Sequence, residues 1–147
     1  MKNIILCDID GTVANNDHRQ HFLEGKKDWD GFFSELINDK PIYKIINKVN
    51  NAYLAGKEII FLTGRPERYR YSTLLWLSEY FNFEPLLLMR NNKDLRTKID
   101  AKKQIFYSNL NTEEIDYILE NDEDLIKMWN EMGLSVVNIN NILKDDS

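Results

Sequence analysis

The chain has 147 residues, of which 43% are hydrophobic and 12% aromatic, a length typical of one domain. Its 19 Lys and Arg against 24 Asp and Glu give a net charge of −5, which argues against a protein that coats DNA by neutralising many phosphates. The one cysteine, Cys7, lies in an apolar run and is best interpreted as a small buried hydrophobe. No secretory signal or membrane-spanning run is recognisable. We therefore expect a single cytoplasmic domain over residues 1–147.

Strand-like apolar runs alternate with helix-like segments, a pattern typical of an α/β fold. We predict a three-layer Rossmann-like fold, with a parallel five-stranded sheet and helices on both faces. The predicted strands are Asn3–Cys7, Glu58–Leu62, Pro85–Met89, Asp116–Leu119 and Ser135–Ile139. The predicted helices are Ile42–Ala55, Pro66–Phe81, Thr97–Leu110 and Asp122–Met132. The last residues, 144–147, are expected to fray.

Residues 13–40 do not fit this alternation. We interpret them as a small cap-like insertion, a long loop with one short helix over about Trp29–Asn38, placed where open α/β sheets bind ligands. Two alternatives stay open for its histidines and aromatic residues: the histidines contact substrate or are plain surface residues, and the aromatic side chains stack a nucleobase or pack in the core. These residues are His18, His21, Trp29, Phe32 and Phe33.

The strongest chemical signal is Asp8-Ile9-Asp10-Gly11-Thr12, directly after the first predicted strand. Strand geometry places Asp8 and Asp10 on one side of the chain. Two adjacent carboxylates repel each other unless a cation lies between them, and Mg²⁺ prefers such oxygen ligands. This motif predicts a magnesium site rather than an acidic turn.

A second signal, Thr63-Gly64-Arg65-Pro66, ends the second predicted strand. A hydroxyl group, a glycine and a proline that opens a helix would place backbone N–H groups around an anion. The same residues also suit an ordinary strand-to-helix turn. The neighbouring position of the first two strands makes an anion site plausible.

Charge is unevenly distributed along the second half of the chain. Residues 65–103 hold nine basic and five acidic residues, whereas residues 111–147 hold two basic and ten acidic ones. Most of the basic residues are expected on solvated helix faces. Arg90, just past the third predicted strand, and Lys102, in the following helix, are the candidates for phosphate binding.

A further acidic group, Glu120-Asn121-Asp122, follows the fourth predicted strand. A carboxylate here would provide a third acidic metal ligand at the same edge of the sheet. Which of the two acids faces the site stays open, because Asp122 is equally suited to capping the next helix.

These four elements together resemble the haloacid dehalogenase-like (HAD) phosphatase superfamily. Over nearly the whole chain the sequence is similar to the 3'-phosphatase domain of phage polynucleotide kinases, and no phosphate-binding loop of a kinase half is present. The segments that carry the resemblance are DIDGTVA, the spacing to Arg19, FLTGRP, LLLMR followed by KKQIF, and ENDEDLIKMWNEMGL.

The resemblance implies roles for these residues. Asp8 would form an aspartyl-phosphate, Asp10 would act as general acid and then base, and Thr63 and Lys102 would hold the phosphoryl oxygens. Mg²⁺ would be held by Asp8, Asp10 and a group among Glu120, Asn121 and Asp122. Substrate contacts would come from Arg19, Thr63, Gly64, Arg65, Arg90 and Lys98.

The sequence departs from the family pattern at two positions. The two adjacent aspartates of the family align with Glu120 and Asn121 here, and Asn121 carries no charge. Either Glu120 alone then provides the acidic metal ligand, or Asp122 provides it. A family aspartate that usually pairs with the neighbouring lysine aligns with Lys98 here. Without that partner, Lys98 or Lys103 could take the role of Lys102 in holding the phosphate.

We predict a Mg²⁺-dependent phosphomonoesterase that removes 3'-phosphates from nucleic-acid ends. One alternative is a 5'(3')-nucleotidase acting on free nucleoside monophosphates, and another is a non-catalytic phosphate-binding or end-binding module. A signalling receiver domain is disfavoured because the third predicted strand ends in Leu88-Met89-Arg90 rather than an aspartate. The small insertion leaves the site open, which favours a polymeric end.

Overall fold

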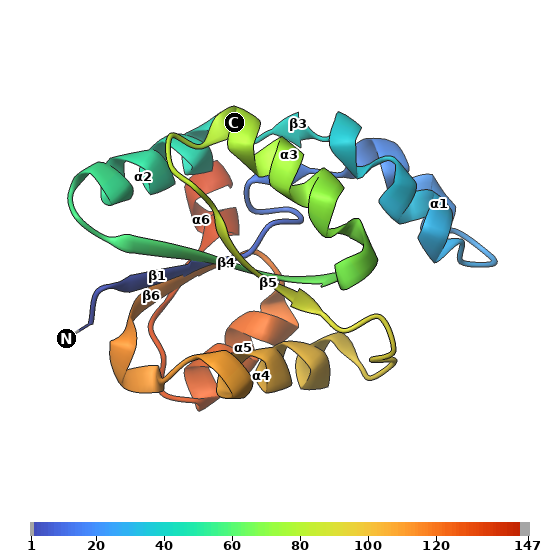
Figure 1. The fold of residues 1–147 in the computed structure, drawn as a ribbon. Helices are drawn as coiled ribbons and strands as arrows, with labels where there is room; N and C mark the ends of the chain where they lie inside the picture. Colours follow the sequence, from blue (N-terminus) through green and yellow to red (C-terminus); the bar gives the residue numbers. More distant parts are fainter. Residues whose placement is uncertain (1, 145–147) are drawn as a thin grey trace.

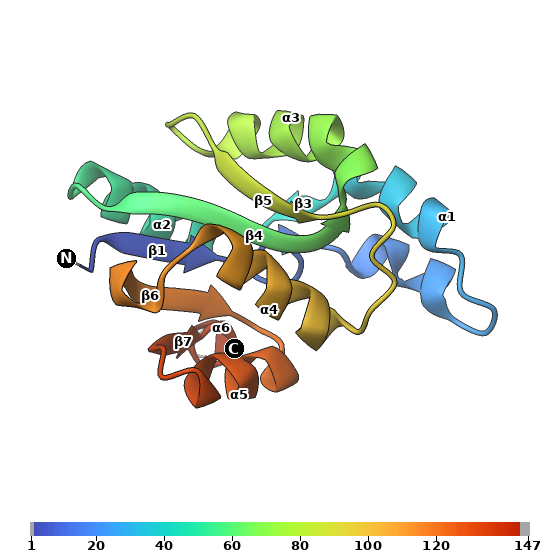
Figure 2. The same cartoon turned by 60° about the horizontal axis from the view of Figure 1, so that its bottom comes forward.

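The computed structural model describes residues 2–144 and confirms the predicted α/β architecture. Five strands form a parallel sheet in the order β5-β4-β1-β6-β7, as Figure 2 shows. Each predicted strand is present with bounds that differ by a few residues. The observed strands are β1 (Ile4–Cys7), β4 (Glu58–Pro66), β5 (Leu86–Arg90), β6 (Ile115–Glu120) and β7 (Val136–Asn138).

Helices cover both faces of the sheet (Figure 1). One face packs against α2 (Tyr43–Leu54), α3 (Arg70–Tyr80) and α6 (Ile139–Lys144). The other packs against α4 (Lys98–Asn109) and α5 (Glu123–Glu131). Alternation along β1 divides the core: Ile5 and Cys7 pack on the first face, whereas Ile4 and Leu6 pack on the second. Cys7 is buried and unpaired, as the sequence predicts.

The insertion after β1 contains more regular structure than the predicted loop with one helix over Trp29–Asn38. Its elements are the strands β2 (Ala14–Asn15) and β3 (Lys40–Pro41), a 3-10 helix (Asp17–Leu23), α1 (Trp29–Ser34) and a 3-10 turn (Leu36–Asn38). The two strands pair antiparallel and close the insertion at its base. Its aromatic and leucine side chains form a small core of their own. Figure 2 shows α1 beyond the carboxyl ends of the main strands.

One predicted helix start and one predicted strand end are wrong. Strand β4 runs on through Pro66, which pairs with Arg90 of β5, and α3 begins at Arg70 after a 3-10 turn. The proline ring fixes φ near a value that both a helix start and an extended backbone accept. In this structure Pro66 is extended (φ −64°, ψ 147°). Ile139, predicted to end the last strand, begins α6. Of the predicted frayed tail, Lys144 ends α6 and residues 145–147 lie outside the described residues. Across residues 2–144 no helix is long and apolar enough to cross a membrane.

Candidate active site

Three neighbouring strands bring the predicted residues to one edge of the sheet. Asp8 follows β1, Thr63 lies in β4 and Glu120 ends β6, and all three side chains are buried. Lys102 reaches the same place from the second turn of α4. Because carboxyl ends of parallel strands meet at one edge, residues distant in sequence form one cluster.

Asp8 lies at the centre of this cluster and is only 6% exposed. Lys102 Nζ donates to its Oδ1 atom over 2.6 Å, and Thr12 Oγ1 donates to its Oδ2 atom over 3.0 Å. Burial, reinforced by the nearby Glu120 carboxylate, raises the pKa of Asp8 to about 8, although Lys102 acts in the opposite direction. The pocket is therefore short of positive charge around Asp8.

Lys102 is held as a cation between Asp8 and Glu120. Burial by itself would lower the pKa of Lys102, but the two carboxylates outweigh it and raise the pKa above its ordinary value. Its Nζ lies 3.4 Å from Glu120 Oε1, which also accepts from Trp129 Nε1 over 3.2 Å. Since Lys102 itself reaches Asp8, the geometry requires neither Lys98 nor Lys103 as a substitute.

Glu120 uses both carboxylate oxygens within the protein. Its Oε2 atom accepts the backbone N–H groups of Asn121 and Asp122 at 3.2 and 3.4 Å, and Oε1 faces Lys102 and Trp129. Glu120 therefore supports Lys102 and the turn that follows β6. The predicted role of Glu120 as a direct metal ligand stays a prediction.

Asn121 instead faces Asp8. Its Oδ1 position lies 2.8 Å from Asp8 Oδ2 and 3.0 Å from the Asp10 carbonyl oxygen, and 3.2 Å from Thr12 Oγ1. Rotating the amide would let its NH₂ group donate to the same three oxygens. Gly11, at φ +81°, permits this approach, because a Cβ atom there would lie 2.2 Å from Asn121 Nδ2.

The converging oxygens fit a hard divalent cation. Asp8 supplies a carboxylate, Asp10 a backbone carbonyl and Asn121 an amide oxygen, which are the ligand types that Mg²⁺ accepts. A cation there would also relieve the charge imbalance at Asp8. Within residues 2–144 no group of three or more His, Cys, Asp or Glu side chains is arranged to hold a metal, so the candidate site depends on the carbonyl and the amide.

Asp122 is the N-cap of α5, which was one of the two alternatives left open by the sequence. Its Oδ1 atom accepts from the backbone N–H groups of Asp124 and Leu125. Its Oδ2 atom accepts from Lys98 Nζ over 2.7 Å. Both oxygens therefore already have partners within the protein, and the role of Asp122 as a metal ligand stays a prediction.

The Asp10 carboxylate contacts two arginines. Arg65 contacts it through Nε at 3.1 Å and Nη2 at 2.9 Å, and Arg19 through Nη2 at 2.6 Å. Burial alone would raise the pKa of Asp10, but Arg65 and Arg19 outweigh it and hold the pKa well below its ordinary value. Asp10 is therefore an ionised carboxylate in this structure.

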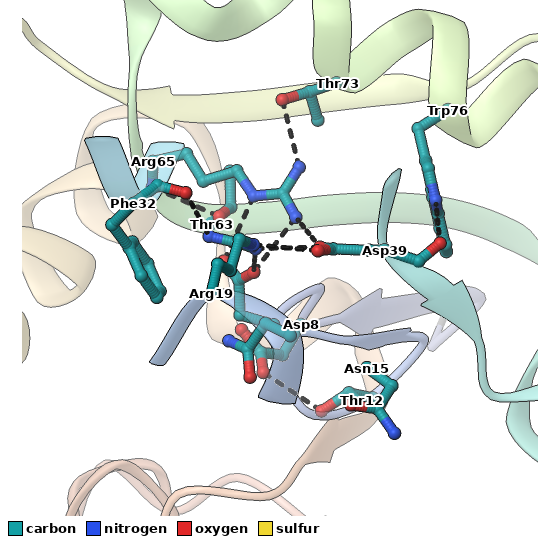
Figure 3. Close-up of polar contacts among 12 residues, drawn as sticks. Asp8, Thr12, Asn15, Arg19, Phe32, Asp39, Thr63, Arg65, Thr73 and Trp76 are labelled. Carbon is teal, nitrogen blue, oxygen red and sulfur yellow. Dashed lines mark hydrogen bonds and ion pairs between the residues drawn. The ribbon is translucent and has the colours of Figure 1, made fainter. Parts of the chain in front are cut away.

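Asp39, which the sequence gave no reason to select, completes this arginine cluster (Figure 3). Its fully buried carboxylate accepts from Arg19 Nε and Nη2 at 2.8 Å each, from Arg65 Nη2 at 3.2 Å and from His18 Nε2 at 2.8 Å. Trp76 Nε1 donates to its backbone carbonyl. The one available signal would have been that two buried arginines need more than one carboxylate.

Arg19 and Arg65 therefore lie differently from exposed substrate contacts. Both are buried, and Arg65 Nη1 donates to Thr73 while Arg19 Nη1 donates to the Phe32 carbonyl. The Arg19 guanidinium also lies 4.2 Å from the centre of the Phe32 ring. Because these bonds fix both side chains, their direct contribution is to hold Asp10 and to join the insertion to it.

The remaining predicted substrate-binding residues already make hydrogen bonds or ion pairs within the protein. Arg90 donates to the backbone carbonyls of Asp94 and Arg96 and so orders the loop after β5. Lys98 pairs with Asp122 and Asp124 and is half-exposed. Thr63 Oγ1 accepts the Arg65 backbone N–H at 3.1 Å. His21 is exposed and packs against Phe22.

Two cavities meet at this site. A small one of about 160 Å³ is lined by Asp8, Lys102 and Asn121, and a larger one of about 480 Å³ extends beneath α1. Asp10 and Gly64 line both. A Cβ atom on Gly64 would meet no other atom within 4 Å, so the space beside Gly64 is open.

The sequence model of a known family matches residues 2–142, and its description is the phosphatase domain of the polynucleotide kinase PNKP. The chain belongs to this family. It is a HAD-type phosphatase domain, as its motifs predict, and hence a hydrolase. A search of curated proteins found no match.

Solved structures agree with this assignment. A chain of the Pnkp1/Rnl/Hen1 RNA repair complex is 26% identical, with a TM-score of 0.77 over 92% of this chain. A second structure of the Pnkp1/Rnl/Hen1 complex is 24% identical over 94% of this chain, also with a TM-score of 0.77. Matched regions cover 41% and 46% of those chains, so this chain spans less than half their length.

A more distant structure shares the fold. The class C acid phosphatase from Bacillus anthracis, with tungstate bound, is 15% identical, with a TM-score of 0.60 over 90% of this chain and 62% of its own. The sheet and its flanking helices are therefore shared with this phosphatase.

Proposed function

We propose that this domain is a Mg²⁺-dependent phosphomonoesterase that removes 3'-phosphates from nucleic-acid ends through an aspartyl-phosphate. The observation that carries the proposal is the environment of Asp8, a buried carboxylate held between the Lys102 ammonium and a group of converging oxygens. The family and the RNA repair proteins similar to this chain support a nucleic-acid substrate.

The two oxygens of Asp8 have different surroundings. Oδ2 belongs to the oxygen group with Asn121 and the Asp10 carbonyl, where Mg²⁺ would be held. When bound, the cation would screen the negative charge of Asp8 from the incoming phosphate. Oδ1, beside Lys102, is left to attack phosphorus, and the lysine supplies positive charge for the phosphoryl oxygens.

In the first step an Asp8 oxygen forms a bond to phosphorus and the bond to the ester oxygen breaks. The departing ester oxygen needs a proton, and Asp10 is the acidic residue that lines both cavities. In the second step water attacks the aspartyl-phosphate, Asp10 accepts a proton from that water, and inorganic phosphate and the free Asp8 carboxylate are released.

The ion pairs of Asp10 keep it ionised, which is the protonation state in which it can accept a proton in the second step. The first step requires a protonated Asp10. A dianionic phosphate bound beside Asp8 would repel the nearby Asp10 carboxylate and so raise the Asp10 pKa. Substrate binding itself would thus prepare the general acid.

The proposal is tested by measuring inorganic phosphate release with Mg²⁺ and with EDTA. The substrates are a 3'-phosphorylated oligonucleotide, the same oligonucleotide phosphorylated at its 5' end, and a panel of nucleoside monophosphates. Preference for the 3'-phosphorylated oligonucleotide, lost with EDTA and with Asp8→Asn, is expected. Turnover confined to monophosphates would indicate a nucleotidase. No metal-dependent turnover of any of these substrates would indicate a different phosphoester or, if wider panels also failed, a non-catalytic end-binding module.

A further inference from the structure

The larger cavity lies where a leaving group would be. In phosphoryl transfer the nucleophile and the leaving group are on opposite sides of phosphorus. Asp8 lines the small cavity, and the large cavity opens from it across Asp10 and Gly64. An ester whose phosphate sits beside Asp8 and Lys102 would therefore place its organic part in the large cavity.

An aromatic wall forms one side of this cavity. Trp29 and Phe33 of α1 stack with ring centres 6.0 Å apart and an angle of 23°, and Trp29 is 48% exposed. Across the opening, the loop after β5 carries Leu95, which is 93% exposed. The exposed Lys27 side chain lies near the Trp29 ring at 5.7 Å, on a long stem that can move aside. The wall suits a flat, apolar occupant.

The charged groups around the cavity already have partners. Arg68 Nη2 pairs with Asp30 at 3.0 Å, and Lys98 pairs with Asp122 and Asp124. Arg90 donates to backbone carbonyls. With its cations paired in this way, the cavity favours a neutral planar group over a second phosphate. Its volume of about 480 Å³ lies within the range of about 300–1,000 Å³ found for small-molecule sites.

We infer that this cavity holds the terminal nucleoside of the substrate, with its base packed against Trp29. The inference rests on the proposed function and deepens it, because it makes the base a recognised part of the 3' end. Base stacking on an aromatic side chain tolerates any sequence, so recognition would depend on the presence of a base rather than on its identity.

Activity measurements compare two 3'-phosphorylated oligonucleotides that differ only in having a base or an abasic sugar at the end. The wild type should favour the base by about tenfold in kcat/KM, which corresponds to about 1.4 kcal/mol. Trp29→Ala should bring the ratio of the two substrates close to one, mainly through KM, whereas Trp29→Phe should retain most of it. Tyr71→Ala, an exposed aromatic of α3 outside the cavity, is the matched control and should keep the wild-type ratio.

Equal turnover of the two ends by the wild type would overturn the inference. So would a Trp29→Ala variant that slows both substrates by the same factor, because that result describes structural damage. If neither 3' end is hydrolysed while glycerol phosphate is, the proposed function fails.

A binding measurement tests independently whether the base enters this cavity. In Asp8→Asn, tryptophan fluorescence is titrated with each oligonucleotide. Trp76 and Trp129 are each 1% exposed and Trp29 is 48% exposed, so quenching by a stacked base would report Trp29. Quenching by the base-bearing end alone would support the inference, and equal or absent quenching would overturn it.

Discussion

The two aspartates of the Asp8-Ile9-Asp10 motif have opposite electrostatic surroundings. Around Asp10, two arginines face two carboxylates, and the charges balance within the protein. Around Asp8, two carboxylates share one ammonium, and three oxygens converge when the Asn121 amide oxygen points inward. The charges on the Asp10 side balance as folded, whereas the Asp8 side keeps excess negative charge that the proposed Mg²⁺ would offset.

This difference separates a cluster that stabilises the structure from a cluster that carries the chemistry. The arginine cluster ties the insertion to the sheet and fixes the Asp10 carboxylate, so changes there should alter stability together with activity. The Asp8 cluster carries excess negative charge, which a bound cation would offset. Changes there should alter chemistry and metal dependence more than folding.

Asp8→Asn should have the largest effect, with phosphate release falling by at least about a thousandfold, as expected when a nucleophile is removed. The amide can still accept a hydrogen bond from Lys102, and it relieves rather than adds negative charge. The urea midpoint should therefore stay the same or rise. Parallel phosphate-release and urea-unfolding measurements check this, and substantial residual turnover would refute covalent catalysis by Asp8.

Asp39→Asn should produce the largest loss of stability. It leaves Arg19 and Arg65 with only the Asp10 carboxylate between them, and breaking a buried network of this kind costs about 3–5 kcal/mol of unfolding free energy. Urea denaturation measures this loss. Asp30→Asn is the matched control, because Asp30 pairs with Arg68 in solvent and its loss should leave the midpoint unchanged. Similar midpoints for both variants would contradict the role given to Asp39.

Asp39 also shows where sequence reasoning stops. The strands and their edge could be predicted because apolar runs and motif positions are local properties of the chain. Asp39 lies in a polar stretch between Asn38 and Lys40, and its importance comes from side chains that arrive from distant segments. No local pattern encodes such an ion-pair cluster.

Other differences between prediction and structure also depend on contacts between segments that are distant in the sequence. Pro66 suits both an extended backbone and a helix start, and sheet pairing with Arg90 decides for the strand. At the end of β6, Glu120 contacts Lys102 and Asn121 contacts Asp8. Sequence position identified the right segment, but which side chain of three consecutive residues faces the site depends on how the turn after β6 is built.

Asn121→Asp should sharpen the metal site rather than destroy it. A carboxylate in place of the amide adds negative charge to the oxygen group, and ligand charge tightens binding of hard cations. The Mg²⁺ concentration for half-maximal activity should fall by about tenfold, whereas Asn121→Ala should raise it by about tenfold. EDTA should abolish the activity of all three proteins. Identical Mg²⁺ dependence of both variants and the wild type would exclude Asn121 as a ligand.

Lys98→Ala should have the smallest effect, although the sequence placed this residue among the substrate contacts. Lys98 is 51% exposed and pairs with Asp122 and Asp124 at the start of α5, and such pairs contribute about 0–1 kcal/mol to stability. Lys102, only 6% exposed at its side chain, touches Asp8 directly. Steady-state kinetics should therefore show kcat and KM within about twofold of wild type, a change of about 0.4 kcal/mol. A large rise in KM with unchanged kcat would instead mean that substrate displaces the ion pairs and binds Lys98, which would extend the phosphate-binding surface from α4 to the rim of the large cavity.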